Sequence, residues 1–367
     1  MKQFFLFSII VAALAIAITA YQATIPNNSA TNKLAVNVSQ TPNETSSVEV
    51  VADNLDIPWA IAFLPNKDFL FTERTGKLKL YSKGKISTIQ EIKDVKVYGE
   101  GGLLGVAVDP NYSSNHYIYL YSTYSTTGVN VLNKVTKYKF ENSKLSDAKI
   151  ILEKIPGSLH HNGGRLKFGP DNYLYVTTGD SENPSFSQNK DSLAGKILRL
   201  TTDGKAAPGN PFNTEIYSYG HRNPQGLSWD SSGRLWETEH GDNATDEVNI
   251  IVKGANYGWP IITGNKTKEG MQSPLAQSGN ETWAPSGNSF LNGSLYFGGL
   301  KGQSLFQVKV VNGNAIITKH LEGEFGRIRD VVTGPDNFLY ITTSNKDGRG
   351  TPVASDDRII KVDPSKL

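Results

Sequence analysis

The chain has 367 residues, enough for one large domain or two ordinary ones and for a sizeable hydrophobic core. Its 37 Lys and Arg residues against 35 Asp and Glu residues leave a net charge of +2. This balance excludes a polyanion-binding surface as the dominant feature, because nucleic-acid-binding modules are usually strongly and locally basic. Cysteine is absent, which excludes disulfides, zinc–thiolate sites, iron–sulfur clusters and a cysteine nucleophile.

The first residues are typical of an export signal. Lys2 precedes an apolar run over residues 4–20 that contains the small-residue pattern Ala15-Ile16-Ala17. Residues 1–20 are therefore predicted to be a signal peptide or, because the run is at the short edge of a membrane span, an uncleaved membrane anchor. A buried first strand or helix is the alternative. Residues 21–47 are rich in Asn, Thr, Ser and Gln and predict a flexible polar linker.

Residues 48–367 are predicted to form one all-β domain built from a repeated unit. Short runs of Val, Ile, Tyr, Phe and Leu are broken by Gly, Pro, Asn and Asp, which is the pattern of strands and turns. Similar hairpin sequences recur, and the apolar residues after their turns are Leu70, Ile118, Leu174, Leu235, Leu295 and Leu339. Six hairpins at a spacing of roughly 50 residues predict a six-bladed β-propeller with four-stranded blades.

A propeller ring must also close. The runs Val48–Val51 and Arg358–Val362 are expected to share the last blade, so that the N- and C-terminal strands close the ring. A pair of β-sandwiches is the alternative architecture, but sandwiches do not require six similar turns.

Two adjacent histidines precede a predicted strand over residues 166–168. Neighbours on an extended chain point to opposite faces, so His160 and His161 are not expected to serve one site together. A neutral imidazole is a suitable general base, although a structural histidine is the alternative. One repeat later, Arg222 lies in the glycine-flanked segment Tyr219–Leu227 and offers a forked donor for an oxyanion or carboxylate. An arginine that braces a loop is the alternative there.

Oxygen ligands are dense in the segment Glu239–Glu247. Ca²⁺ prefers carboxylate and carbonyl oxygens in flexible geometry, although the spacing is not that of an EF-hand, and a solvated turn is the alternative. Nearer the C-terminus, Arg327 and Arg329 are two residues apart and are expected on one face of a strand. A ligand with several carboxylates would satisfy both, with Lys301 as a third positive charge. An exposed strand with alternating arginines is the alternative.

Several segments together resemble the soluble quinoprotein sugar dehydrogenases of the glucose/sorbosone dehydrogenase family, and more closely their compact aldose sugar dehydrogenase branch. The resemblance covers roughly residues 50–365. It depends on the number and order of the following segments: Gly101–Gly105, His161–Leu166, Gly220–Leu227, Glu239–Gly241, Asp246–Asn249, Asn256–Pro260, Ala284–Gly287 and Arg327–Asp330.

This resemblance implies an oxidoreductase that binds pyrroloquinoline quinone (PQQ) and calcium in a six-bladed propeller. By motif position, His161 would take the proton from the anomeric hydroxyl of an aldose while hydride passes from the sugar C1 to the quinone C5, which gives the lactone. Arg222 would stabilise charge that develops at the C5 oxygen. The implied cofactor contacts are Glu100, Arg222, Asn223, Thr282, Lys301, Arg327 and Arg329.

The resemblance also implies two calcium ions. Carbonyl oxygens of Gly241 and Asp242 would hold the ion at the cofactor, and Glu247 and Tyr257 resemble ligands of a structural ion. Electrons would pass to an external quinone, cytochrome or dye. The protein would lie outside the cell, in the periplasm or on the outer face of the cell membrane, as a monomer or dimer that binds no nucleic acid.

The sequence departs from the family pattern at three positions. Glu100 stands where relatives usually have Gln, and a carboxylate facing an anionic cofactor must be protonated, paired or turned away. Asp242 replaces a frequent proline, which leaves a backbone-carbonyl role intact. His160 stands where relatives often have Asp or Asn, so the sequence does not show what tunes His161. Two alternatives are a non-enzymatic carbohydrate-binding or receptor-like propeller that has lost the cofactor, favoured by Glu100, and a calcium-dependent lactonase propeller.

Overall fold

The structure is a computed structural model that describes residues 47–127 and 130–367. The predicted signal peptide and almost all of the predicted linker lie outside these residues. Within the described ranges, no helix has the length and apolar character needed to cross a lipid bilayer.

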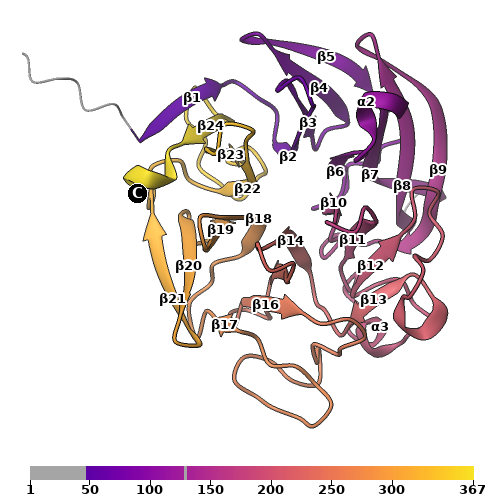
Figure 1. Ribbon diagram of the computed structural model, residues 1–367, viewed down its shortest axis with the longest axis vertical. Helices are drawn as coiled ribbons and strands as arrows, with labels where there is room; N and C mark the ends of the chain where they lie inside the picture. Colours follow the sequence, from indigo (N-terminus) through magenta and orange to yellow (C-terminus); the bar gives the residue numbers. More distant parts are fainter. Residues whose placement is uncertain (1–46, 128–129) are drawn as a thin grey trace, which may run out of the picture. The chain divides into compact units, whose positions relative to one another are not determined.

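Six antiparallel four-stranded sheets form a ring, so the prediction of a six-bladed β-propeller is confirmed (Figure 1). The first three blades are β2 (Pro58–Phe63), β3 (Phe69–Glu73), β4 (Lys77–Ser82) and β5 (Lys85–Glu91); β6 (Leu103–Val108), β7 (Tyr117–Thr127), β8 (Asn130–Glu141) and β9 (Lys144–Pro156); and β10 (Leu166–Phe168), β11 (Leu174–Thr178), β12 (Lys196–Leu200) and β13 (Ile216–Tyr219).

The other three blades complete the ring. They are β14 (Pro224–Trp229), β15 (Leu235–Glu239), β16 (Glu247–Ile251) and β17 (Ala276–Gln277); β18 (Pro285–Leu291), β19 (Ser294–Gly299), β20 (Leu305–Val311) and β21 (Asn314–His320); and β22 (Ile328–Thr333), β23 (Leu339–Thr343), β24 (Ile359–Val362) and β1 (Val48–Ala52). The short helices are α2 (Tyr112–Asn115), α3 (Ser185–Gln188), η1 (Pro211–Asn213) and η2 (Pro364–Lys366).

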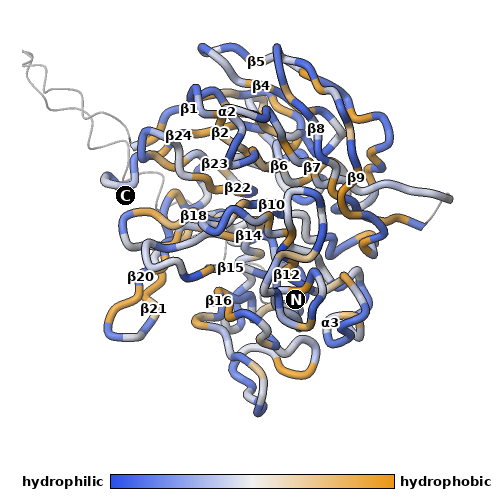
Figure 2. The backbone as a smooth tube through the Cα atoms, turned by 45° about the vertical axis from the view of Figure 1, so that its right-hand side comes forward, coloured by the Kyte–Doolittle hydropathy of each residue, from blue (hydrophilic) through white to orange (hydrophobic). Residues whose placement is uncertain are grey.

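The repeated hairpins have the positions that the sequence predicted. The six apolar residues after the turns all lie in the second strand of their blades, and all are buried: Leu70, Ile118, Leu174, Leu235, Leu295 and Leu339. The closing blade is also as predicted, because β1 pairs with β24 and places Val48 opposite Val362. Apolar segments lie mainly in the strands, whereas many connecting turns are hydrophilic (Figure 2). The core is therefore made between blades, as in other radial repeats.

The innermost strands of the six blades are β2, β6, β10, β14, β18 and β22 (Figure 1). In every blade the first strand begins at the same mouth of the ring. Because the second strand is antiparallel to the first, it ends at that mouth as well. Five of the six first strands have a register shift near this end. Such irregularities re-aim side chains next to functional sites. This mouth, called the entry mouth below, thus receives two loops from every blade.

Candidate functional site

The predicted site residues gather in loops at the entry mouth. Those in loops that enter first strands, or at the start of such a strand, are Glu100, His161, Arg222, Asn223, Thr282, Arg327 and Arg329. Those in loops that follow second strands are Gly241, Asp242 and Lys301, and Glu247 begins the third strand of the fourth blade. Residues that are far apart in the sequence therefore meet because the blades repeat the same connection around one axis.

His161 is oriented by a buried carboxylate. Its Nδ1 lies 2.7 Å from Oδ1 of Asp180, which follows β11 in the same blade. The Asp180 side chain is 1% exposed and also accepts hydrogen bonds from the Trp259 indole at 2.8 Å and the Glu182 amide at 2.9 Å. Because Nδ1 is engaged by a carboxylate, Nε2 is the nitrogen left to accept a proton.

The sequence did not point to Asp180, because it lies 19 residues after His161 and outside the histidine motif. The available signal was the Gly179-Asp180 pair directly after the predicted strand of the same hairpin. An added Cβ at Gly179 would lie 2.0 Å from the His161 carbonyl oxygen, so only glycine permits this close approach. The acidic partner of His161 therefore comes from the loop after β11, the second strand of the same hairpin.

His160 has a different carboxylate partner from His161. Its Nδ1 lies 2.9 Å from Oε1 of Glu182, and its side chain is 35% exposed. The expectation that the two imidazoles do not act together agrees with this arrangement, but its premise was wrong. His161 has a φ of 57°, so the chain turns tightly here and is not extended. The turn and the two separate carboxylates distinguish the histidines.

Arg222 and Asn223 continue the same network. The Arg222 carbonyl accepts the Asp180 amide at 2.8 Å, and the Arg222 guanidinium carbon lies 5.2 Å from the centre of the Trp259 ring. Oδ1 of Asn223 accepts the Gly163 amide at 3.1 Å. His161, Arg222 and Asn223 thus belong to one contiguous site.

A second part of the entry mouth is a basic cavity of about 200 Å³. Its charged lining residues are Arg74, Glu100, Arg329, Asp347 and Arg349. Arg74 and Arg349 were not singled out in the sequence, because neither is part of a motif. The three guanidiniums against two carboxylates make this cavity attractive to a polyanion.

Glu100 is paired, which is one of the three solutions expected for a carboxylate at this position. Its Oε1 accepts Arg349 at 2.6 Å, and its Oε2 accepts the His161 amide at 3.1 Å. Burial opposes ionisation, but His240, Arg349 and the His161 amide together lower the pKa of Glu100 to about 2. The Glu100 carboxylate therefore joins the loop that carries His161 to the basic cavity.

Arg327 and Arg329 have different hydrogen-bond partners. Nε and Nη2 of Arg327 donate to Asp347 at 3.0 and 2.8 Å, so a carboxylate of the protein itself already neutralises Arg327. Arg329 donates to Oε1 of Gln225 at 2.6 Å, and burial lowers the pKa of Arg329 to about 9. Arg327 directly precedes β22, whereas Arg329 lies within that strand at a register shift between Ile328 and Asp330.

Lys301 and Thr282 lie at more open positions. The Lys301 side chain is exposed. The Thr282 hydroxyl donates to the Asn243 carbonyl at 2.8 Å, which attaches it to the oxygen-rich loop rather than to the basic cavity.

Buried donors without partners are concentrated at the entry mouth. Among the described residues, the side-chain nitrogens there that are buried and have no hydrogen-bond partner are Arg74 Nε, Arg222 Nε, Asn223 Nδ2, Arg329 Nε and His240 Nε2. Buried polar groups are usually satisfied, so unpaired donors in one region favour a bound acceptor-rich group. A flat cofactor with several carboxylates and carbonyls fits this donor set.

The oxygen-rich loop after β15 is folded around Asp246. Oδ1 of Asp246 accepts the Gly241 amide at 2.9 Å, and its Oδ2 accepts the amides of Trp283 and Ala284 at 2.6 and 2.8 Å. A Cβ at Gly241 would lie 2.2 Å from the Ala244 carbonyl oxygen. Backbone oxygens are therefore crowded near Gly241, and such oxygens suit a hard cation.

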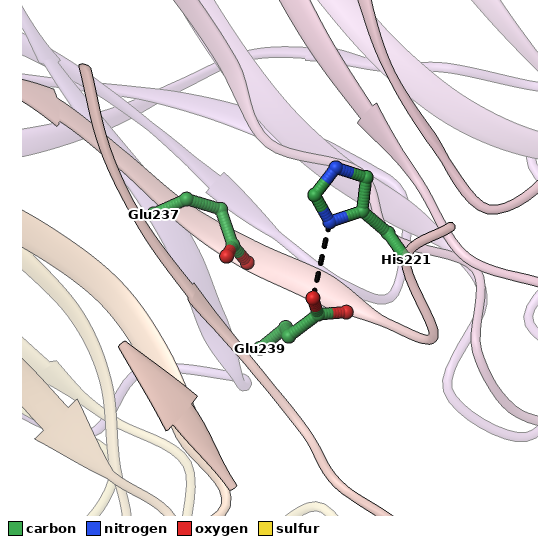
Figure 3. A group of neighbouring side chains, drawn as sticks. All are labelled: His221, Glu237 and Glu239. Atoms are coloured by element: carbon green, nitrogen blue, oxygen red, sulfur yellow. Dashed lines mark hydrogen bonds and ion pairs between the residues drawn. The ribbon is translucent and has the colours of Figure 1, made fainter. Parts of the chain in front are cut away.

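Behind this loop lies a buried acidic cluster. Glu237, Glu239 and His221 bring potential ligand atoms within 4.8 Å of one another (Figure 3). His221 Nδ1 lies 3.0 Å from Oε1 of Glu239, and Asn249 Nδ2 donates to Glu237 at 3.0 Å and to Glu247 at 3.2 Å. Oε1 of Glu237 and Oδ1 of Asn249 are buried without a partner among the described residues.

The environment of Glu247 is suited to a small cation. Burial, and then the neighbouring Glu239, raise the pKa of Glu247 to about 8. A cavity of about 10 Å³ lies between Glu239, Glu247 and Tyr257, which is about the size of one water molecule. The Tyr257 hydroxyl already donates to Ile250 O at 2.7 Å and accepts the Val252 amide at 2.8 Å, so only its main-chain carbonyl is left for a metal.

The family model of glucose/sorbosone dehydrogenases matches residues 55–354 of the chain. Aldose sugar dehydrogenase YliI of Escherichia coli is 36% identical over 342 residues, which cover 83% of this chain and 91% of the relative. Quinoprotein glucose dehydrogenase B of Acinetobacter calcoaceticus is 34% identical, with 62% and 55% covered. The PQQ-bound aldose sugar dehydrogenase from Streptomyces coelicolor superposes with a TM-score of 0.80 at 40% identity, covering 86% of this chain and 97% of that structure.

Proposed function

The chain belongs to the glucose/sorbosone dehydrogenase family, and from this premise we propose that it is a PQQ-dependent dehydrogenase that oxidises the anomeric C1 hydroxyl of aldoses to the lactone. The observation that carries the proposal is the contiguity of the His161–Asp180 pair with buried, unpartnered donors of Arg222 and Asn223. A base and an acceptor-rich ligand would thus share one site.

His161 is the proposed general base. With Nδ1 held by Asp180, its Nε2 would accept the proton of the sugar C1 hydroxyl, and the buried carboxylate would stabilise the resulting imidazolium. General bases typically contribute about 10²–10⁴-fold to a rate. Glu100 acts on the same loop by accepting the His161 main-chain amide, which fixes the backbone that carries the base.

The cofactor is proposed to lie against the unpartnered donors. When bound, PQQ supplies the two-electron acceptor for the oxidation. Arg222 and Asn223 would bind its polar edge near the base, and Arg329 would bind carboxylates, with Lys301 and Thr282 as further ligands. Arg327 is already engaged by Asp347, so we propose that it mainly positions the neighbouring Arg329.

Two calcium ions are part of the proposal. The carbonyl oxygens of Gly241 and Asp242 would hold one ion at the cofactor, where it acts as a Lewis acid. The second would be held by Glu247 and the Tyr257 carbonyl, with Glu239 as an additional carboxylate that lines the same small cavity.

The test is reconstitution of the purified protein with PQQ and Ca²⁺, followed by cofactor titration and dye reduction with a panel of aldoses. We expect saturable PQQ binding and sugar-dependent reduction. His161→Ala should reduce turnover by roughly 10²-fold or more while PQQ still binds. His160→Ala is the matched control, because its imidazole pairs with Glu182 and should be dispensable for turnover.

Absence of both PQQ binding and dye reduction would overturn the proposal and favour a non-enzymatic binding propeller. The feature that favoured that alternative, Glu100, is ionised and paired with Arg349. The external electron acceptor is proposed to be a quinone or cytochrome. Export through residues 1–20 also stays a prediction, since those residues are outside the described ranges.

A further inference from the structure

A second cavity lies in the propeller channel at the mouth opposite the site. It measures about 270 Å³ and lies among the four inner strands β2, β6, β10 and β22, with Asn288 from β18. Its walls are mostly apolar and include Ile61, Phe63, Val106, Val108, Leu166, Phe168 and Val332. None of the proposed cofactor or metal residues lines it. We call it the far-mouth cavity.

Three charged side chains line the far-mouth cavity, and their charges do not balance. Lys167 lies on β10, Arg165 directly precedes that strand, and Asp330 comes from β22. Nη1 of Arg165 lies 3.0 Å from Oδ1 of Asp330, so this carboxylate is matched by the arginine. Asp330 is the one carboxylate among the described residues that line the cavity, so the two positive charges there exceed the negative charge by one. The residues contributed by β2, β6 and β18 are uncharged.

Two residues that line the cavity each have a buried polar atom without a partner. Nη2 of Arg165 and Oδ1 of Asn288 are buried without a hydrogen-bond partner among the described residues. Arg165 is 5% exposed and Asn288 2% exposed, so neither side chain is broadly solvated. The other groups of Arg165 are used, because Nε donates to Gln225 O at 2.8 Å and the guanidinium packs 4.4 Å from the Trp59 ring. Both unpartnered atoms are enclosed by protein, whereas the Lys167 side chain is half-buried and supplies a positive charge that a ligand can reach.

We propose that the far-mouth cavity is a binding site for a small monocarboxylate with an apolar body. The carboxylate would bind the Lys167 ammonium, and one negative charge would neutralise the excess. The apolar walls would cover an aliphatic or aromatic group.

Size and polarity favour an organic acid over an inorganic anion. The cavity volume of about 270 Å³ is far more than a halide ion needs. Apolar walls also penalise a small hydrated ion, which would lose its water without gaining contacts. Benzoate is a suitable probe because it combines a flat apolar ring with one carboxylate.

The experiment is calorimetric titration of the full chain with sodium benzoate at pH 7, with and without bound PQQ and Ca²⁺. We expect one benzoate per chain in both states, and at least 10-fold weaker binding of the neutral isostere benzamide. Lys167→Met should weaken benzoate at least 10-fold while sugar oxidation is unchanged. Lys309→Met, at an exposed position on β20, is the control and should leave benzoate binding unchanged.

The pH dependence gives an independent measurement. Burial lowers the pKa of Lys167 to about 8, with Asp330 opposing and Arg165 reinforcing the shift. A carboxylate binds the protonated amine, so benzoate affinity should fall as the pH rises through 8 and should lose this dependence in Lys167→Met. No saturable binding, equal binding of benzamide, insensitivity to Lys167→Met, or displacement of benzoate by PQQ would each overturn the assignment. Sugar oxidation by the PQQ-loaded protein could still be normal in every one of those cases, so the two proposals are tested separately.

Discussion

The two ends of the blades use the same kinds of residues in opposite ways. At the far mouth, turn aspartates bind within their own hairpins. An aromatic side chain of the second strand donates to the turn carboxylate at 2.8–3.0 Å in four blades, and these pairs are Tyr119–Asp109, Tyr175–Asp171, Trp236–Asp230 and Tyr340–Asp336. At the entry mouth, Asp180 and Glu100 instead bind residues of other loops and other blades.

This difference separates scaffold from site. A turn carboxylate that is satisfied inside its own hairpin can be repeated in every blade, because it needs nothing from its neighbours. The entry-mouth carboxylates each have a different set of partners, and unpartnered buried donors lie among them. The repeated turn contacts therefore belong to the framework of the fold, and the candidate site lies where the contacts differ from blade to blade.

The largest effect is expected from Asp180→Asn, which removes the charge that orients His161. An amide can present the wrong group to Nδ1 and cannot stabilise the imidazolium, so turnover with saturating aldose should fall about 10²-fold. PQQ affinity should change little. The split between kcat and KM distinguishes this from general damage, because the fall should appear in kcat while the KM for the aldose changes little. A loss of PQQ affinity as large as the loss of turnover would contradict the orienting role.

Gly179→Ala should affect both stability and turnover. The added Cβ would lie 2.0 Å from the His161 carbonyl oxygen, so the loop that carries His161 must move. This movement should lower the free energy of unfolding by about 1–3 kcal/mol. Gly313→Ala is the far-mouth comparison, because its φ of 82° strains alanine but nothing lies within 4 Å of the new Cβ. We expect denaturant melts to detect both changes and dye assays to detect only the first. Loss of turnover in Gly313→Ala would break the distinction between the two ends.

Glu100→Gln should lower stability in a pH-dependent manner. The folded-state pKa of about 2 lies below the ordinary 4.5, so the ionised group stabilises the fold above pH 4.5, and this contribution is lost as the pH falls toward 2. The substitution leaves Arg349 without its carboxylate, at a cost on the order of 1.5–3 kcal/mol near neutral pH. Denaturant melts from pH 2 to 7 should show a flatter pH dependence in the variant. A parallel shift at all pH values would exclude the ion pair as the cause.

The smallest effect is expected at the far mouth, from Tyr340→Phe. The hydroxyl donates to Asp336 at 3.0 Å, and its loss should cost about 1 kcal/mol without any change in turnover. Blade one already has Phe71 at the equivalent position, which shows that the fold accepts phenylalanine there. Reduced sugar oxidation in this variant would mean that the far-mouth turns contribute to catalysis after all.

Local pattern was sufficient to predict most of the architecture. Turn residues and alternating apolar residues are properties of a short stretch of chain, so six similar hairpins could be recognised and counted. The closing strand could also be predicted, because Val48–Val51 and Arg358–Val362 are the only strand patterns left at the two ends of the repeat. His161, Arg222 and Arg329 could be chosen because they stand in motifs.

The partners of these residues were decided only by the tertiary structure. Asp180, Arg349 and Trp259 stand outside the chosen motifs or had no assigned role, and they reach the site because loops from different blades converge on one axis. The partners of Arg327 and Arg329 were also decided in space, because Asp347 and Gln225 come from other segments of the chain. The sequence alone determined which segments repeat and which residue types are reactive. The closed ring decided which charges meet, because electrostatic and hydrogen-bond partners depend on distances in space and not on separation along the chain.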